Sequence, residues 1–405
     1  MAGRAARLPE GVRITDEISL GVVAKTFPAE KVKEVLAATG RQSQRQRQLP
    51  APVMVYYVIA LSLYTRASCR EVLRCLLEGI QRLWGPEYEY RTAGRAGISQ
   101  ARERLGWEPL QKLHDEMVGP IAGETTRGAW YKRWRVISLD GSTLDLPDTP
   151  GNVRAFGRPG ASRGSSAFPQ LRFVSLVENG THVLFGTQLG RYRTAETKLA
   201  QQVLGSLQAG MLCLADRLFY SFPLWNRARA RADLLWRVKK NMRLPCEKRL
   251  PDGSYLSRVY RCEKDRRQGR KAVQVRVIEY DLPGVAPAAP LYRLLTTLLD
   301  EQAAPAQELA VLYHRRWTIE TALAELKTHL RDGRLVLRSK RPDLVRQEFY
   351  GFLMAHFAIR GLMHEAARKA GESPGRLSFL HTVRVVRRKL PEFVAIPPLE
   401  AAAVA

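Results

Sequence analysis

The sequence has 405 residues, of which 45% are hydrophobic and 26% charged, enough apolar material for two or three globular domains. Its 65 Lys and Arg against 39 Asp and Glu leave a net charge of +26. A charge that large points to a polyanionic partner, nucleic acid first and an anionic membrane second. No apolar run reaches the ~18 residues of a membrane span, and the start lacks the apolar core of a secretory signal. Five scattered cysteines without a Cys-x2-Cys pair argue against disulfides or structural zinc and fit a reducing cytoplasm.

The N-terminal third favours an all-helical domain, which we place at residues 1–128. MVYYVIALSLYTR (54–66) predicts a buried helix. SCREVLRCLLEGIQRLWG (68–85) carries apolar residues at the i, i+3, i+4, i+7 spacing of an amphipathic helix. Residues 1–50 are polar and basic, and either contact DNA or form a solvated linker.

From Trp130 the pattern becomes that of an α/β domain built around one mixed sheet flanked by helices. WRVISLDGS (134–142) predicts a short strand that closes at Asp140. Two apolar runs joined at Glu178-Asn179-Gly180 predict a hairpin. Four further elements are expected in alternation: helices at 195–207 and 221–232, and buried strands at 211–217 and 233–240.

The last part of the chain interrupts and then completes this domain. Residues 240–290 are rich in Arg and Lys and have β-like pieces around Asp-Gly and Gln-Gly turns, which predicts a β-rich insertion. A long helix is expected over 304–333 and further helices over 342–390, before a disordered tail. The expected α/β domain therefore comprises 129–239 and 291–340, followed by C-terminal helices and tail over 341–405.

Polar groups share one face of the predicted long helix. Tyr313, Arg316, Glu320 and Lys327 stand at i, i+3, i+7 and i+14, within an arc of roughly 60° at 100° per residue. This face either carries function or is the solvated side of an amphipathic helix. An apolar stripe on a neighbouring face is expected to be buried: Ile319, Leu323, Leu326 and Leu330.

Two aspartates at predicted strand ends are the expected partners of this helix. Asp140 and Asp216 each close a strand, and functional side chains gather at strand ends in α/β sheets. Together with Glu320 they would give three carboxylates that repel one another. Bound divalent cations such as Mg²⁺ would offset this repulsion. In isolation Asp140 could cap a turn, and Asp216 could pair with Arg217 or cap the next helix.

Other kinds of site are absent or weakly signalled. No Gly-x4-Gly-Lys-Ser/Thr motif occurs, which disfavours a nucleotide-driven motor, and no His pair has zinc spacing. His314 beside the helix motif is expected to be a hydrogen-bonded side chain and not a ligand. AFGRPGASRGSS (155–166) either tracks phosphates or is a surface loop.

With these residues in view, the chain resembles the DDE transposases of bacterial insertion sequences, specifically the IS-four family. The most specific element is Tyr-x2-Arg-x3-Glu-x6-Lys, met by Tyr313, Arg316, Glu320 and Lys327. The resemblance covers roughly residues 15 to 390, and LADRLFYS (214–221) departs from it at Leu218, where glycine is commoner. The other segments that carry it are DGSTLDLPDTPGN (140–152), LLWRVKKN (234–241), ISLGVVAKTFPAEKVKEVL (18–36) and LPAPVMVYYVIALSLYT (49–65).

The resemblance implies a ribonuclease-H-like catalytic domain with a β-rich insertion between the second Asp and the Glu. It implies a triad of Asp140, Asp216 and Glu320 that holds two Mg²⁺ or Mn²⁺ ions. Some members cut the second strand through a DNA hairpin and stack a flipped base on a Trp of the insertion. This chain has no Trp between Trp236 and Trp317. The residues expected at the transposon end are Tyr313, Arg316, Lys327, Arg217 and Trp317, and the tyrosines that could replace the missing Trp are Tyr255, Tyr260 and Tyr280.

The function predicted is that of a transposase which excises its element and joins the 3′-hydroxyl ends to target DNA. Its expected partners are double-stranded terminal inverted repeats, target DNA and a second copy of itself in a synaptic complex, in the bacterial cytoplasm at the nucleoid. Two alternatives stay open: a Mg²⁺-dependent nuclease of the same fold without strand transfer, and a non-catalytic DNA-binding derivative of a transposase.

Overall fold

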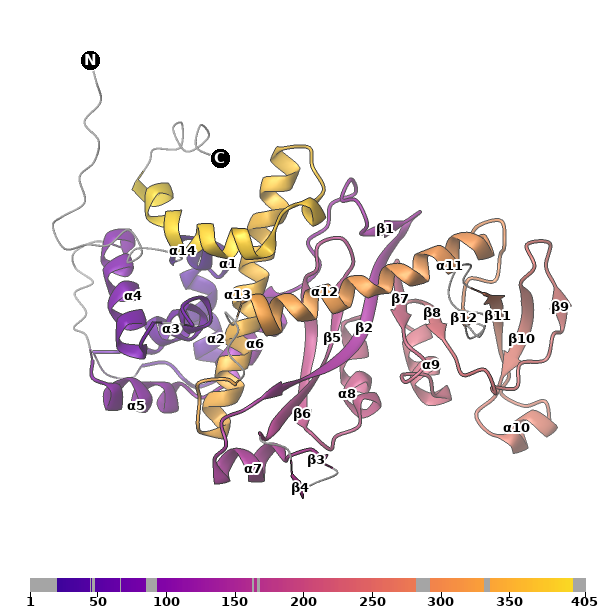
Figure 1. Ribbon diagram of the computed structural model, residues 1–405, viewed down its shortest axis with the longest axis horizontal. Helices are drawn as coiled ribbons and strands as arrows, with labels where there is room; N and C mark the ends of the chain where they lie inside the picture. Colours follow the sequence, from indigo (N-terminus) through magenta and orange to yellow (C-terminus); the bar gives the residue numbers. More distant parts are fainter. Residues whose placement is uncertain are drawn as a thin grey trace, which may run out of the picture. The chain divides into compact units, whose positions relative to one another are not determined.

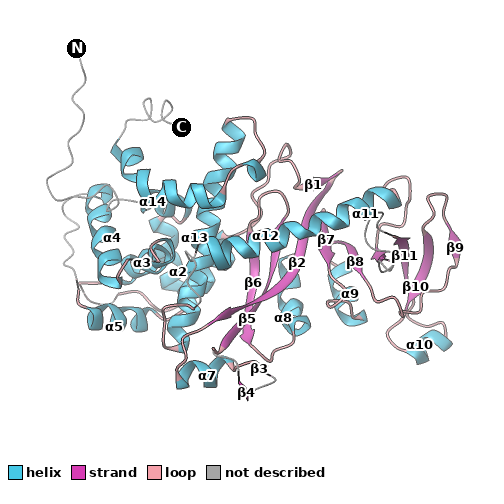
Figure 2. Ribbon diagram, in the orientation of Figure 1, coloured by secondary structure: helices cyan, strands magenta, loops and turns pink. Residues whose placement is uncertain are grey.

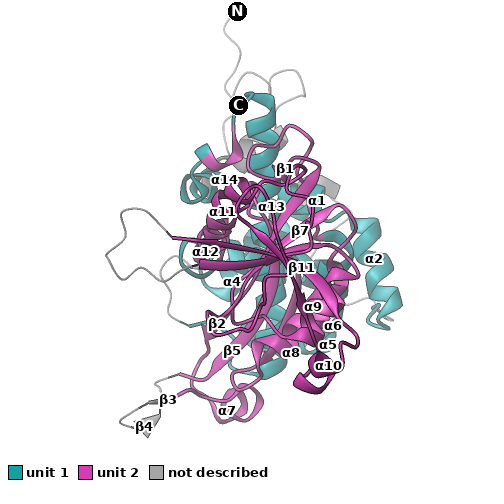
Figure 3. Ribbon diagram, turned by 90° about the vertical axis from the view of Figure 1, so that its right-hand side faces the viewer, with its two compact units in different colours: residues 1–117, 325–372, 376–405 teal, residues 118–324, 373–375 magenta. Residues whose placement is uncertain are grey.

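The computed structural model of the chain describes residues 20–43, 45, 48–65, 67–84, 93–161, 164–165, 168–281, 292–330 and 336–395. The chain divides into two compact units (Figure 3). We call residues 1–117, 325–372 and 376–405 the helical unit, and residues 118–324 and 373–375 the sheet unit. Within the described ranges, no helix is long and apolar enough to cross a membrane. The predicted disorder of the tail lies outside these ranges.

The helical unit is built around a helix that is apolar on every side. Residues 53–63 of that helix are all buried, as predicted, and it packs against a 28-residue helix from the C-terminal part of the chain. Its elements are α1 (Leu20–Thr26), α2 (Ala29–Ala38), α3 (Ala51–Leu63), α4 (Cys69–Trp84), α5 (Arg95–Leu105), α6 (Glu108–Met117), a π-helical turn (Glu325–His329), α13 (Pro342–Lys369) and α14 (Phe379–Ala395). A 3₁₀ turn (Pro374–Arg376) joins α13 to α14.

The main sheet of the sheet unit is mixed (Figures 1 and 2) and has the strand order β6-β5-β2-β7-β8-β12-β11-β10-β9, with β1 paired to β2. β3 and β4 form a separate two-stranded sheet. β2, β7 and β8 run parallel, and the other neighbouring pairs are antiparallel. The strands are β1 (Trp130–Tyr131), β2 (Trp134–Asp145), β3 (Gly160–Ala161), β4 (Gly164–Ser165), β5 (Gln170–Glu178), β6 (Leu184–Arg191), β7 (Met211–Ala215), β8 (Asp233–Arg237), β9 (Lys248–Arg249), β10 (Tyr255–Val259), β11 (Val273–Tyr280) and β12 (Tyr292–Thr296). The helices are α7 (Pro150–Phe156), α8 (Glu196–Val203) with a 3₁₀ turn (Leu204–Ser206), α9 (Phe222–Arg229), α10 (Glu263–Arg267), α11 (Ala306–His314), a 3₁₀ turn (Arg315–Trp317) and α12 (Thr318–Ala324).

This architecture confirms the predicted fold class, a mixed α/β sheet flanked by helices together with a helical N-terminal region. The hairpin predicted at Glu178-Asn179-Gly180 is formed by β5 and β6. The predicted β-rich insertion continues the main sheet, because β12 pairs with β8 and the strands β11, β10 and β9 follow outward. Residues 282–290 of that prediction lie outside the described part of the chain.

The long helix predicted over 304–333 is interrupted twice, so that prediction is wrong in detail. α11 passes through the 3₁₀ turn into α12, and the Thr318 hydroxyl donates to the Arg315 carbonyl oxygen at 2.7 Å, which supports the tighter turn. In the π-helical turn, the Leu330 N–H donates to the Glu325 carbonyl oxygen, five residues back, at 2.9 Å. A helical wheel at 100° per residue therefore does not describe the whole stretch.

Candidate active site

The two predicted aspartates come directly after paired positions on neighbouring parallel strands. The parallel pairing of β2 with β7 ends at Leu139 and Ala215, and Asp140 and Asp216 are the next residues. Adjacent strands lie about 4.8 Å apart, so the two backbones present these residues side by side. Their side chains are 24% and 23% exposed, which leaves both carboxylates within reach of solvent.

Asp140 does not close its strand, contrary to the prediction. β2 continues to Asp145, because its other edge stays paired with β5 as far as Asp145 and Gln170. What ends at Leu139 is the pairing with β7 alone. Asp140 therefore lies where two parallel strands part, on a strand held in place from one side. Its own Oδ1 accepts a hydrogen bond from the Gly141 N–H at 2.8 Å.

Asp216 follows the end of β7, as predicted, but neither of its two simple alternative roles is what the structure has. The next helix, α9, is capped by the Ser221 side chain, which accepts from the Leu224 N–H. The cation nearest to Asp216 in an ion pair is Arg237, with Nη1 at 3.9 Å from Oδ1.

Arg237 was missed by the sequence reasoning, because its place beside Asp216 depends on the register of β7 with β8. The parallel pairing of β7 with β8 ends at Ala215 and Trp236, so Arg237 flanks Asp216 as Asp140 does on the other side. The Arg237 guanidinium also lies over the Tyr292 ring, 4.1 Å from its centroid. Three adjacent parallel strands thus present Asp, Asp and Arg at one level of the sheet.

Arg316 links Asp140 to the predicted helix carboxylate. Its Nη1 donates to Asp140 Oδ2 at 3.2 Å, and its Nη2 lies 4.0 Å from Glu320 Oε1. Arg316 is 12% exposed, whereas Glu320, in the first turn of α12, is 54% exposed. α12 packs against β2, so the backbone that carries Glu320 is fixed to the strand that carries Asp140.

The ionisation of these groups is mutually dependent. Burial raises the pKa of Asp140, and the charges of Glu196 and Asp216 add to the rise, while the Gly141 N–H and Arg316 oppose it. Burial alone would lower the pKa of Arg316, yet the surrounding negative groups hold it above its usual value. The carboxylates that act on Arg316 are Asp140, Asp216 and Glu320, and the Tyr313 phenol also lies near it.

Among the described residues, no three His, Cys, Asp or Glu side chains lie close enough together to hold a metal ion. In their place, Asp140 and Glu320 approach Arg316, and Asp216 approaches Arg237. The donor chemistry nevertheless fits a divalent cation, because three hard carboxylate oxygens from two adjacent strands and one packed helix are partly open to solvent.

A fourth carboxylate, also missed, stands beside Asp140. Glu196 begins α8 and lies so close to Gly141 that a Cβ there would be 2.8 Å from Glu196 Cδ. Arg172 on β5 holds Glu196 in place, with Nη1 2.7 Å from Oε1. A glycine after Asp140 is therefore required by the position of Glu196, and no spacing in the sequence signalled that contact.

The predicted DNA contacts differ in exposure. Trp317 is 63% exposed and Arg217 is also on the surface, so both are accessible beside the acidic residues. Tyr313 is 4% exposed, and its hydroxyl donates to the carbonyl oxygen of Ala215 at 3.5 Å. Lys327 lies half-buried in the π-helical turn, which belongs to the helical unit.

Two predictions with no catalytic content are confirmed. His314 is hydrogen-bonded, with Nε2 3.0 Å from the Tyr280 hydroxyl. The apolar stripe is buried throughout, at Ile319, Leu323, Leu326 and Leu330.

The tyrosines considered for base stacking are engaged to different degrees. The hydroxyl of Tyr255, which is 9% exposed, donates to Glu279 at 3.1 Å. Tyr280 stacks on Tyr292 with ring centroids 5.4 Å apart. Tyr260 is half-exposed, and the Arg266 guanidinium lies 5.7 Å from its ring centroid. Tyr260 and Tyr280 are therefore both more exposed than Tyr255.

Comparison with known proteins gives consistent matches over both units. Residues 17–115 match the family described as Insertion element 4 transposase N-terminal, and residues 132–358 match Transposase DDE domain. The transposase InsG for insertion sequence element IS4 of Escherichia coli (strain K12) is 28% identical over 375 residues, covering 89% of this chain and 80% of that relative. The putative transposase InsZ of the same strain is 26% identical over 207 residues, covering 51% of this chain and 66% of that relative. A cryo-EM structure of a piggyBac transposase synaptic complex with hairpin DNA matches 95% of this chain and 84% of its own, with a TM-score of 0.45 and 12% identity.

Proposed function

Because this chain belongs to the DDE transposases of the insertion element 4 family, we propose that it cuts DNA at the ends of its own element and joins them to target DNA. The reaction is a phosphodiester hydrolysis followed by a transesterification in which the freed 3′-hydroxyl attacks the target strand. The observation that supports this most directly is that Asp140 and Asp216 stand side by side where β2 and β7 part, while Arg316 reaches from Asp140 toward Glu320.

Members of this family generally use a divalent metal, and we propose Mg²⁺ or Mn²⁺, two ions per site, held by Asp140, Asp216 and Glu320. When bound, such ions activate a water or hydroxyl and stabilise the leaving oxygen of the phosphodiester. The chain's own contribution is a fixed positive charge beside the carboxylates, from Arg316 at Asp140 and Glu320 and from Arg237 at Asp216. At Asp140, Arg316 opposes the rise in pKa that burial causes.

The same cations are suited to hold DNA. We propose that Arg316, Arg217 and Lys327 contact phosphates at the transposon end, since guanidinium groups bind phosphate in a bidentate manner and lysine acts as a point charge. Trp317 is exposed enough to stack on a base. Tyr313 would act through Arg316, whose guanidinium lies 6.0 Å from the Tyr313 ring centroid.

The partners and the division of labour along the chain follow from this reaction. We propose that residues 1–128 bind the terminal inverted repeats, that 129–239 with 291–340 form the catalytic domain, and that 240–290 and 341–405 are its insertion and C-terminal extension. The net charge of +26 supports double-stranded DNA as the partner. Two copies would join two transposon ends in a synaptic complex, in the bacterial cytoplasm at the nucleoid.

The test is cleavage and joining of labelled transposon-end DNA by Asp140→Ala, Asp216→Ala and Glu320→Ala. Each variant should lose both activities while its affinity for DNA persists, because affinity comes mainly from Lys and Arg contacts with phosphate. Glu308→Ala is the matched control, since that α11 carboxylate is bound to Tyr131 and Lys132 away from Arg316. If any triad variant cuts at the rate of this control, the assignment fails at that residue.

The wild-type reaction separates the proposal from its alternatives. Joined products support a transposase, cut products without joining support a nuclease, and binding without cutting supports a non-catalytic derivative. Excess EDTA should stop cutting, and Ca²⁺ should permit assembly with little chemistry, because its looser coordination positions an in-line attack poorly. Full cutting in EDTA would exclude a metal-dependent reaction.

A further inference from the structure

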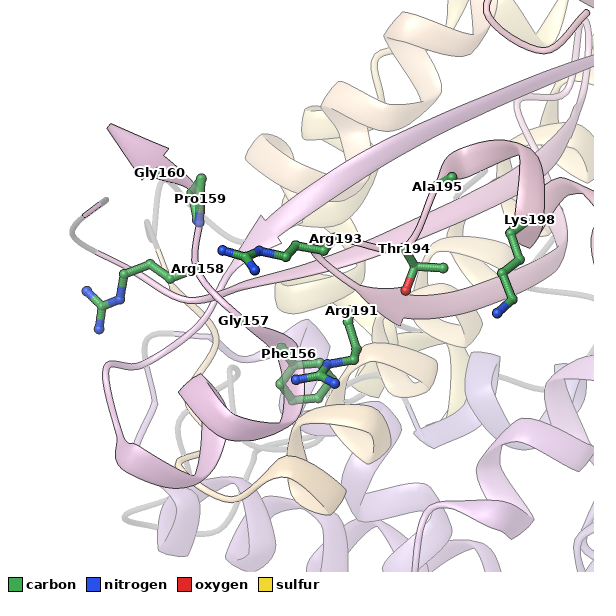
Figure 4. Close-up of a pocket in the computed structure, with 10 residues that line it drawn as sticks. All are labelled: Phe156, Gly157, Arg158, Pro159, Gly160, Arg191, Arg193, Thr194, Ala195 and Lys198. Carbon is green, nitrogen blue, oxygen red and sulfur yellow. The ribbon is translucent and has the colours of Figure 1, made fainter. Parts of the chain in front are cut away.

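A basic groove lies in the sheet unit at the start of α8, the helix whose first residue is Glu196. It has a volume of about 760 Å³. Figure 4 shows its four cationic side chains, which come from three different segments of the chain. We define the basic groove by these four: Arg158 after α7, Arg191 at the end of β6, Arg193 in the following turn, and Lys198 in the first turns of α8.

Most of the charge in the basic groove is not neutralised by the protein. Among the described residues that line it, none is acidic. Arg158 is paired with Asp148, outside the lining. Arg191 donates to the backbone carbonyl of Arg154 at 2.9 Å, so its charge has no acidic partner among the described residues. Arg193 and Lys198 are exposed and likewise lack an acidic partner in that part of the chain.

The residues that line the basic groove favour a polyanion over a small apolar ligand as its occupant. Small-molecule pockets of this size are lined mainly by apolar and aromatic side chains with a few polar groups. Here Phe156 is the only aromatic residue among the described lining residues, and glycine backbone at Gly157 and Gly160 leaves the groove open to an extended chain.

The position of the basic groove relative to Asp140 can be worked out from the strand register. Leu144, four residues beyond Asp140 on β2, pairs with Leu171 on β5, and Leu171 pairs with Arg191 on β6. Four residues span about 14 Å along a strand, and two strand spacings add about 10 Å across the sheet. Along the sheet, Arg191 is therefore about 17 Å from Asp140. Lys198, on the α8 side of the groove, is two residues from Glu196, whose side chain lies against Gly141.

We propose that the basic groove binds the phosphate backbone of DNA that runs past the candidate active site. This inference rests on the proposed transposase function and adds a contact surface outside the signature helix. The bound strand would come either from the donor flank next to the transposon end or from the target. The chemistry recognised is the same in both cases, a run of phosphodiesters.

The experiment compares two triple variants of the full chain. Arg191→Ala/Arg193→Ala/Lys198→Ala removes three charges from the groove. Arg227→Ala/Arg229→Ala/Arg231→Ala removes three exposed charges from α9 and the turn after it, which controls for the loss of overall charge. Each protein is titrated in a salt series with an uncut end carrying donor flank, a pre-cut end, and a plain target duplex, and melting temperatures confirm folding.

The groove variant should lower the slope of log affinity against log salt by about 2 to 3 relative to wild type, at 0.7–0.9 per phosphate contact. The control variant should change the slope less on the same DNA. If the groove variant loses affinity only for donor DNA that carries the flank, the groove binds the donor flank. If it loses affinity for the target duplex and joins ends to it less well, the groove binds target DNA. Equal slopes and equal activities for the two variants on all three DNAs would overturn the proposal.

Failure of this inference is distinguishable from failure of the proposed function. If wild-type protein neither cuts nor joins, the transposase proposal fails. The salt slopes, which need no chemistry, still decide whether the groove binds DNA.

Discussion

Replacing Gly141 with alanine tests the local geometry around Asp140. A Cβ at position 141 would lie 2.8 Å from Glu196 Cδ, closer than real Cβ atoms approach, and 3.1 Å from its Cγ and Oε1, which is a tight contact. Glu196 cannot simply swing away, because Arg172 Nη1 holds its Oε1 at 2.7 Å. The Arg172 Nε is itself fixed by the Tyr192 carbonyl oxygen at 2.9 Å. Either the Arg172–Glu196 pair breaks or the backbone at Asp140 shifts.

The magnitudes favour a modest loss of stability and a larger loss of activity. Overpacking costs about 1–3 kcal/mol, losing a partly exposed ion pair costs up to about 1 kcal/mol, and removing a strand glycine returns about 0.5–1 kcal/mol. A net cost near 1 kcal/mol lowers the melting temperature of a unit this size by about 2–4 °C. The Gly141 N–H donates to Asp140 Oδ1 at 2.8 Å, so a shift moves that carboxylate. A displacement of about 1 Å can reduce a catalytic rate about 100-fold.

The assay is a double-mutant cycle read by melting temperature, with DNA cleavage measured in parallel. Glu196→Ala removes the atoms that a Cβ would meet, so Gly141→Ala should be tolerated in its presence. We expect a coupling of about 1 kcal/mol, within the range found for residues in contact. Wild-type stability and cleavage in Gly141→Ala would refute the reasoning. The reasoning would also be refuted if Gly141→Ala lowered the melting temperature equally in the wild-type and Glu196→Ala backgrounds.

Three further predictions concern other parts of the chain. Glu178→Ala should lower the free energy of unfolding, measured with urea, by about 3–5 kcal/mol. The reason is that the buried carboxylate pairs with Arg135 and accepts hydrogen bonds from the N–H groups of Ile121 and Ala122 at 2.9 and 3.0 Å. A decrease below about 1 kcal/mol would contradict this prediction. Gly351→Ala should lower the melting temperature, since its Cβ would lie 2.7 Å from the Val58 carbonyl oxygen of α3, whereas Gly361→Ala in the same helix meets nothing within 4 Å and should stabilise by about 1 kcal/mol. If Gly361→Ala lowered the melting temperature more than Gly351→Ala did, the packing of α13 against α3 described above would be wrong. Arg316→Ala and Lys327→Ala should each impair cleavage at the transposon end and lower the slope of log affinity against log salt by about 0.7–0.9, without unfolding the protein. If both variants keep the wild-type slope and cleavage rate, these residues do not bind phosphate and belong to a solvated surface.

The elements that sequence reasoning located correctly are those whose pattern is local. β7, β8 and α9 carry their own apolar runs and a serine cap, so Asp216 could be placed at a strand end. Asp140 could not be placed correctly, because the length of β2 depends on its pairing with β5, which is separated from it in sequence. The 3₁₀ turn before α12 and the π-helical turn after it could not be predicted, because the spacing of the apolar residues is compatible with α, 3₁₀ and π turns alike.

The missing parts of the candidate site share a cause. Arg237 becomes significant only once the register of β7 with β8 is known. Glu196 becomes significant only through its contact with Gly141 across chain segments 55 residues apart in number. Both are set by tertiary contacts, and hydrophobic periodicity does not report such contacts.

The strands that extend the sheet beyond β8 have a consequence for solubility, since they cover a strand edge that would otherwise be open. β8 has the buried centre Leu234, Leu235 and Trp236, and β12 pairs with its outer edge. A chain without this pairing would present an apolar edge strand to other copies, which is a template for aggregation. With the added strands, the sheet ends instead at β9, two exposed residues that are both cationic, Lys248 and Arg249. Such a short charged edge repels a second copy and offers it few hydrogen bonds, so these strands protect the protein from aggregation whether or not they touch DNA.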